Sequence, residues 1–287
     1  MLLHGILWFW LLIQTVSRVA GGDVTCKLQD NFNTRGLFKS GDVVLGGLFI
    51  VHFRTAQRNT SLHSKPEEKG LRWVQTMIFT IEEINRNPAL LPNTTLGYRV
   101  MDSCDTSSEA LKCTLQFLNQ DEEKAPLGHQ CDRSPSVPLI IGDAGSSHSA
   151  AVSRIVGLFG IPLVSYFATC ACLSDKREFP TFLRTVPSDA VQVKALVSLV
   201  QRFQWTWVGV VAADSDYGQF GIQSFIEEVT NSNVCIAYIE FIPPVRTRDM
   251  IQQIVNTIGT SSARVMVLFC GEIGSLSQIR LPNYSQS

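Results

Sequence analysis

The sequence predicts an α/β protein built as two doubly wound lobes, and three observations lead to this fold class. From about residue 40, apolar runs of strand length alternate with segments whose apolar residues recur at helical spacing. Runs such as Trp205–Ala213 are almost continuously apolar, which indicates strands covered on both faces in a parallel sheet with crossover helices. There are more such units than one sheet comfortably holds, so we expect a crossing between lobes at Phe182–Ser188.

The first lobe is expected to span residues 23–188. Its strands are predicted at Val43–Phe49, Leu96–Met101, Val137–Ile141 and Ile161–Phe167. Helical spacing predicts helices between these strands at 71–86, 107–118 and Ser146–Phe159. The first must end at Asn87-Pro88, and Thr106-Ser107-Ser108-Glu109 is a capping box that opens the second.

The second lobe is expected at residues 189–275 and is predicted to be incomplete, with a divergent tail at 276–287. Ser188 caps its first helix, whose apolar residues run from Val193 to Val200. Two further helices are predicted by the apolar spacing at 222–229 and 251–258. The strands of this lobe are predicted at Trp205–Ala213, Val234–Ile242 and Arg264–Cys270.

The N-terminus indicates export. An apolar run at Gly5–Ile13 precedes small residues, so residues 1–22 are predicted to be a signal peptide, with a signal anchor as the alternative. Glycosylation sequons begin at Asn59, Asn93 and Asn283. The eight cysteines include no CxxC pair, which in an exported chain favours structural disulfides. For Cys170-Ala171-Cys172 we expect two separate disulfides or buried thiols rather than a metal or redox pair.

Composition and motifs exclude several classes of function. The net charge is −1 with 17% charged residues, so no basic surface is expected for nucleic acid. The chain lacks GxGxxG, a phosphate-binding P-loop, HExxH, GxSxG and zinc-ligand spacing. We therefore expect no cofactor, no metal site and no catalytic residues, and a binding protein rather than an enzyme.

Two turns at predicted strand ends could bind a small ligand. Ile141–Ser147 leads through glycines to a helix start, where backbone N–H groups and the Ser146 hydroxyl suit a carboxylate; Asp143 counts against an anion there. Asp214–Gly218 follows another strand, and Tyr217 together with Asp189 could hold a cation. The alternative for each is an ordinary capped turn without a ligand.

Motifs over about residues 40–275 resemble the extracellular ligand-binding domain of class C G-protein-coupled receptors. They are Gly46-Gly47-Leu48-Phe49, Ile81-Glu82-Glu83-Ile84-Asn85, Leu90-Leu91-Pro92-Asn93, Leu96-Gly97-Tyr98, Phe182-Leu183-Arg184-Thr185-Val186-Pro187-Ser188-Asp189, Trp205-Thr206-Trp207-Val208 and Asp216-Tyr217-Gly218. Within that family, Ala168–Ser174 (ATCACLS) is most similar to the vomeronasal type-2 olfactory receptors of fish, and less similar to the related taste and calcium-sensing receptors. The resemblance implies a Venus-flytrap domain of the periplasmic-binding-protein type, in which two lobes close on a free amino acid.

By matching motif, the resemblance places the ligand's carboxylate against Ser146, Thr169 and backbone groups of Phe167, and its amino group against Asp189 and Tyr217. It also implies a homo- or heterodimer, with Cys131 as a possible inter-chain disulfide. The extracellular side of the plasma membrane would be reached only through domains beyond Ser287. Two hypotheses follow: the amino-acid-binding region of a chemosensory receptor, or a secreted soluble binding protein that does not signal.

Overall fold

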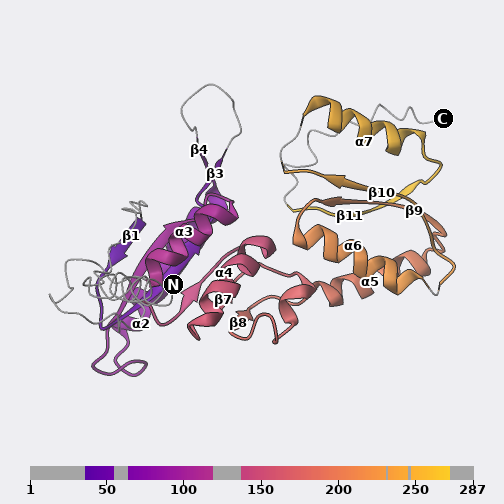
Figure 1. The fold of residues 1–287 in the computed structure, drawn as a ribbon. Coiled ribbons are helices and arrows are strands. Elements are labelled where there is room, and N and C mark those ends of the chain that lie inside the picture. Colours follow the sequence, from indigo (N-terminus) through magenta and orange to yellow (C-terminus); the bar gives the residue numbers. More distant parts are fainter. Residues whose placement is uncertain (1–35, 55–63, 119–136, 231, 245–246, 272–287) are drawn as a thin grey trace, which may run out of the picture.

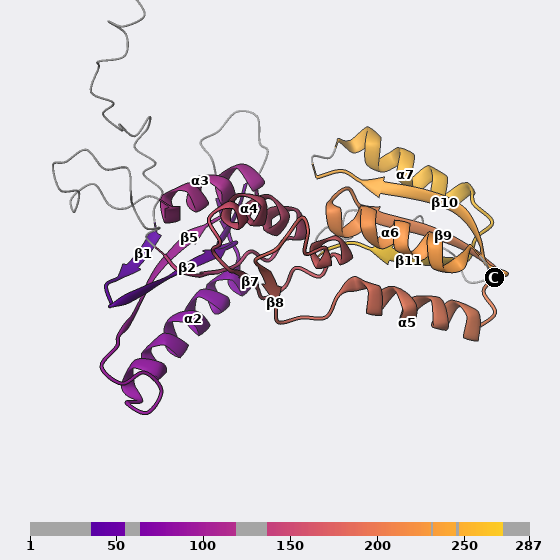
Figure 2. The ribbon, with the colours of Figure 1, turned by 60° about the horizontal axis from the view of Figure 1, so that its bottom comes forward.

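The computed structural model describes residues 36–54, 64–118, 137–230, 232–244 and 247–271. They form two α/β lobes, and the chain passes from one to the other between β8 (Phe182–Arg184) and α5 (Asp189–Arg202) (Figures 1 and 2). The predicted two-lobe α/β architecture is confirmed. Within the described ranges, no helix has the length and apolar character needed to cross a bilayer.

Lobe 1 is organised around a six-stranded sheet with the strand order β1-β5-β2-β6-β7-β8. All neighbours pair in parallel except β1, which runs antiparallel to β5 at the edge. The remaining strands are β1 (Gly36–Lys39), β2 (Val43–Phe49), β5 (Leu96–Asp102), β6 (Ile140–Ile141) and β7 (Leu163–Ser165). Because the chain proceeds from β2 to one side and then to the other, the order reverses between β2 and β6, and such points bind ligands at the carboxyl ends of strands.

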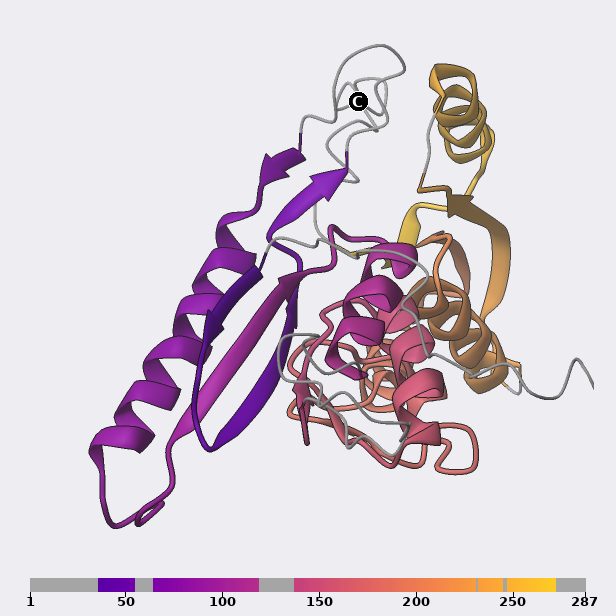
Figure 3. The same cartoon turned by 60° about the vertical axis from the view of Figure 1, so that its left-hand side comes forward.

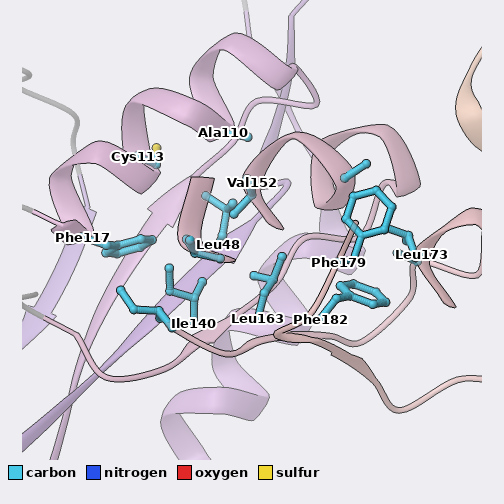
Figure 4. Close-up of a cluster of buried hydrophobic side chains, with 14 of the residues drawn as sticks. Leu48, Ala110, Cys113, Phe117, Ile140, Val152, Leu163, Leu173, Phe179 and Phe182 are labelled. Atoms are coloured by element: carbon cyan, nitrogen blue, oxygen red, sulfur yellow. The ribbon is translucent and has the colours of Figure 1, made fainter. Parts of the chain in front are cut away.

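Helices cover both faces of the lobe 1 sheet (Figure 3). On one face α2 (Glu68–Arg86) buries Val74, Met77 and Ile81, at helical spacing, against Phe49 and Val100. On the other face lie α3 (Ser107–Leu118) and α4 (Ser146–Leu158), where the main core is built from fully buried side chains of sheet and helices (Figure 4). This core holds the start of α4 against the end of β6.

Lobe 2 contains a three-stranded parallel sheet with the order β10-β9-β11. Its strands are β9 (Trp207–Ala213), β10 (Cys235–Ile242) and β11 (Val265–Phe269). The helices α5 and α6 (Asp216–Val229) pack on one face, and α7 (Arg248–Thr260) packs on the other (Figure 1). The central strand β9 is buried from Val208 to Ala212, as its unbroken apolar sequence predicts.

Some strand predictions for lobe 1 were wrong. The strand expected at Val137–Ile141 is only the two residues of β6, and the one at Ile161–Phe167 is only β7. Pro138 and Pro162 shorten both, because proline has no N–H for a sheet. The start of the expected crossing at Phe182–Ser188 is β8, which pairs with β7 before the chain leaves the lobe. The edge strand β1 and the hairpin of β3 (His52–Arg54) with β4 (Ser64–Pro66) were not predicted.

Candidate functional site

The first part of the site is the turn between β6 and α4. Gly142 has φ +143°, and a Cβ there would lie 2.3 Å from the carbonyl oxygen of Leu48, so this position needs glycine. Gly145 is the N-cap of α4 and has no side chain to cap the helix, which leaves first-turn N–H groups for other partners. The buried Ser146 hydroxyl accepts a hydrogen bond from the Cys170 amide at 3.2 Å. Its own proton remains available to an acceptor such as a carboxylate.

Residues 167–170, called the Thr169 segment below, lie beside Ser146 and are held in place by two polar side chains. Ser165 Oγ accepts hydrogen bonds from the amides of Phe167 (3.3 Å) and Ala168 (2.9 Å). The Arg184 guanidinium donates to the carbonyl oxygens of Thr169 (3.0 Å) and Cys170 (2.9 Å). Because both anchors bind backbone groups, the position of Thr169 is set by lobe 1 itself.

Cys170 and Cys172 form a disulfide with each other, with Cα atoms 5.3 Å apart. The expectation of two separate disulfides or buried thiols was therefore wrong. The short 3₁₀ turn at Ala171–Ser174, which begins directly after Cys170, brings the two side chains together. The disulfide closes the end of the Thr169 segment.

Asp189 is a buried carboxylate at the start of α5, where the chain enters lobe 2. Ser188 caps the helix through the Ala190 amide, and the Asp189 amide donates to the Thr169 carbonyl at 2.8 Å. The residue is only 2% exposed, and neither carboxylate oxygen has a hydrogen bond of full geometry in the described part of the chain. Burial raises the pKa of Asp189, while the nearby Thr169 hydroxyl and Arg184 lower it. A buried carboxylate of this kind calls for a cationic partner.

Tyr217 is the lobe 2 side chain of the site on α6, near Asp189. It lies in the first turn of α6, and its ring packs edge-on against Phe269, with centroids 6.4 Å apart. Burial raises the pKa of Tyr217, a hydrogen bond with the Gln192 side chain lowers it, and the neighbouring Asp189 charge raises it. The Tyr217 hydroxyl is therefore within electrostatic reach of the Asp189 carboxylate. The Asp216 amide of α6 donates to Ser147 Oγ of α4 at 3.1 Å, so the two helix starts meet directly.

An aromatic cluster next to the Thr169 segment was missed by sequence reasoning. The Trp73 ring from α2 lies 4.8 Å from Tyr166 and 5.7 Å from Phe167, between centroids. The Phe167 side chain is 54% exposed, and its amide donates to Ser165 rather than pointing to open space. Trp73 lies at a helical spacing typical of ordinary core residues, so no local signal connects it to Phe167.

Among the described residues, no group of three or more His, Cys, Asp or Glu side chains is arranged to hold a metal ion. The site consists of a helix N-terminus with two hydroxyl side chains on one side and a buried acid with a phenol on the other. Such an arrangement suits a small molecule that carries both a negative and a positive group.

Comparison with known proteins places the chain in a family. Residues 72–280 match the family model described as the receptor family ligand binding region. The chain is 44% identical over 243 residues to the extracellular calcium-sensing receptor of Sus scrofa, an alignment that covers 80% of the chain and 22% of that receptor. The chain belongs to the ligand-binding region of the class C G-protein-coupled receptors.

Other class C relatives agree. Metabotropic glutamate receptor 4 of Mus musculus is 37% identical over 243 residues, covering 81% of the chain and 26% of the receptor. The human G-protein coupled receptor family C group 6 member A is 35% identical over 246 residues, covering 80% and 26%. The chain thus spans about a quarter or less of the length of these relatives. They are receptors and not enzymes, so the predicted class C resemblance and the non-enzymatic reading are both confirmed.

The finer similarity to vomeronasal type-2 and fish olfactory receptors stays a prediction. Of the expected site residues, the structure brings Ser146, Thr169, Asp189 and Tyr217 into one neighbourhood through the contacts above. Of the sequons, Asn93 is exposed in the turn between α2 and β5. The predicted signal peptide, the sequons at Asn59 and Asn283 and the possible inter-chain Cys131 lie outside the described residues.

Proposed function

We propose that this class C ligand-binding region holds a free α-amino acid between its lobes. The observation that carries the proposal is the Asp189 carboxylate, which is buried without a full hydrogen bond and lies beside the Thr169 segment and Tyr217. A ligand ammonium group would pair with Asp189 and contact the Tyr217 ring or hydroxyl. Such a partner would offset the free energy that burial of the unpaired acid costs.

The ligand's carboxylate would bind on the lobe 1 side. There the α4 N-terminus offers first-turn N–H groups, and the Ser146 hydroxyl adds a donor. The Thr169 hydroxyl would add a second donor once the ligand's ammonium group replaces it at Asp189. The Asp189 amide donates a hydrogen bond to the Thr169 carbonyl, so the segment that carries the acid lies directly beside the segment that carries the Thr169 hydroxyl. This adjacency supports a small ligand that carries both an amino and a carboxylate group.

In the cell, we propose that the amino acid drives lobe closure in a chemosensory receptor on the extracellular side of the plasma membrane. Closure follows because lobe 1 and lobe 2 residues contact the same ligand, which gives the closed state the higher affinity. The direct hydrogen bond between Ser147 and the Asp216 amide supports this coupling of the helix starts. The proposal includes dimerisation with a second ligand-binding region of the same or a related receptor.

Serine and threonine variants test the carboxylate assignment. Ser146→Ala and Thr169→Ala are each expected to weaken amino-acid binding by about 1.5–3 kcal/mol, because each removes a charge-assisted hydrogen bond. Calorimetric titration of the secreted chain measures the effect, and Ser198→Ala, an exposed serine on α5, is the matched control. If both variants bind like the control, the carboxylate does not lie on Ser146 and Thr169.

A further inference from the structure

A second buried carboxylate lies behind the Ser146 turn and plays no part in the amino-acid site described above. Asp143 is 0% exposed and stands in the turn between β6 and α4. Its Oδ1 accepts a hydrogen bond from the Ala144 amide, and the Gly145 amide also bonds this carboxylate. Its Oδ2 has no hydrogen-bond partner in the described part of the chain. Asp143 is therefore an internal carboxyl group at the same helix N-terminus that is proposed to bind the ligand's carboxylate.

His148 is the counterpart of Asp143. Its Nδ1 atom lies 3.8 Å from Asp143 Oδ2 and 3.9 Å from Asp105 Oδ1, and its side chain is 13% exposed. The ring packs on Gly145, where an added Cβ would come within 2.5 Å of Nδ1. Nδ1 is itself buried and without a hydrogen bond among the described residues. The imidazole and the carboxylate thus face each other with polar atoms that have no hydrogen bond, and each residue is within three positions of Gly145 and Ser146.

Three other titratable side chains lie near Asp143 and His148, and two of them do not change protonation near pH 7. Asp105 comes from the turn before α3, Cys113 from α3 and Tyr166 from the segment after β7. Burial raises the pKa of the Cys113 thiol to about 12 and raises that of Tyr166, so both stay neutral near pH 7. Burial likewise raises the pKa of Asp143, while His148 and a hydrogen bond from Ser103 lower it.

We propose that Asp143 and His148 form a proton-binding pair that sets how strongly the α4 N-terminus holds the ligand's carboxylate. The inference rests on the proposed amino-acid site and adds a control of its affinity. When the pair loses a proton, its additional negative charge opposes the incoming carboxylate at the same helix end. When the pair gains a proton, that opposition is removed, so this contribution to affinity increases as the pH falls.

The first experiment needs no ligand. The free energy of unfolding of the secreted chain is measured from about pH 4 to about pH 8 for the wild type and for Asp143→Asn. Because the folded pKa of Asp143 is raised, its protonated form stabilises the fold fully below the unfolded pKa of about 3.9, and this stability is lost as the pH rises through the folded pKa. The free energy of unfolding of Asp143→Asn, relative to that of the wild type, should therefore increase as the pH rises. Parallel profiles would overturn the proposal.

The second experiment measures affinity for single L-α-amino acids by calorimetry at about pH 5.5 and about pH 7.5. The ratio of the Asp143→Asn affinity to the wild-type affinity should grow about three- to tenfold between these values, which corresponds to a change of about half to one unit in the pKa of the pair. Titration of Asp189 affects both proteins equally and cancels in the ratio. The ratio of the His148→Gln affinity to the wild-type affinity should change with pH in the same way, whereas the ratio for His52→Gln, whose imidazole pairs with Asp102, should stay constant.

The outcomes separate the two proposals. Binding with a ratio that does not change with pH would overturn the proton-linked pair and leave the amino-acid site intact. No binding by any variant at either pH would contradict the proposed function, and the unfolding profiles would still decide whether Asp143 takes up a proton in the folded chain.

Discussion

Asp189→Asn is expected to abolish most amino-acid binding while leaving the unliganded protein at least as stable as the wild type. The substitution removes the charge that pairs with the ligand's ammonium group, which costs about 3 kcal/mol or about a hundredfold in affinity. The same charge is buried without a full hydrogen bond in the unliganded protein, so its removal relieves a desolvation cost. Function and stability should therefore change in opposite directions.

The pH dependence follows from the raised pKa of Asp189. Affinity of the wild type should decrease as the pH falls through that raised pKa, because the protonated acid no longer attracts an ammonium group. In the absence of ligand the sign is reversed: the stability of the wild type relative to Asp189→Asn is highest below the unfolded pKa and declines as the pH rises through the folded pKa. Thermal unfolding with and without ligand measures both. The assignment of Asp189 to the ligand's amino group is contradicted if Asp189→Asn binds the amino acid like the wild type. It is also contradicted if the unliganded variant unfolds at a much lower temperature than the wild type.

Gly218→Ala is expected to destabilise lobe 2 by about 2–4 kcal/mol, because the new methyl group would clash with backbone. A Cβ at this position would lie 2.0 Å from the carbonyl oxygen of Ala213, where β9 ends and α6 begins. Since the same turn places Tyr217, ligand-dependent stabilisation should also be lost. The matched control is Gly259→Ala in α7, where a Cβ meets nothing within 4 Å.

The control should leave stability unchanged or raise it by up to about 1 kcal/mol, because alanine favours a helix more than glycine does. Chemical denaturation followed by circular dichroism compares the two variants. Equal unfolding midpoints would show that the close approach of α6 to β9 is not a constraint on this fold.

Local sequence signals predicted much of the fold. The Ser188 cap of α5 and the end of α2 before Pro88 depend only on neighbouring residues, and the structure contains both. Of the predicted capping box at Thr106, the structure contains the hydrogen bond from the Glu109 amide to the Thr106 hydroxyl, whereas the Thr106 amide donates to the Ser103 carbonyl. For β9, which is buried on both faces, the predicted end at Ala213 is confirmed, and the predicted start at Trp205 is two residues early. By contrast, β8 is too short for periodicity to reveal, and its partner β7 is distant in the sequence.

The site was less accessible to sequence reasoning than the fold. The motifs named Ser146, Thr169, Asp189 and Tyr217, but the isolation of the Asp189 carboxylate depends on packing between segments far apart in the chain. The contact of Trp73 with Phe167 has the same origin. The Cys170–Cys172 disulfide depends on a single 3₁₀ turn, and two cysteines separated by one residue do not by themselves predict that turn.

The most direct test of the central claim is a calorimetric comparison of L-α-amino acids with their matching α-hydroxy acids on the same purified chain. The two ligands share the carboxylate and the side chain and differ in the group that would face Asp189. We expect the amino acid to bind and the hydroxy acid to lose about a hundredfold or more in affinity, because the latter leaves a desolvated carboxylate unpaired. Equal affinity for the two ligands would contradict recognition of an amino group by Asp189 and Tyr217.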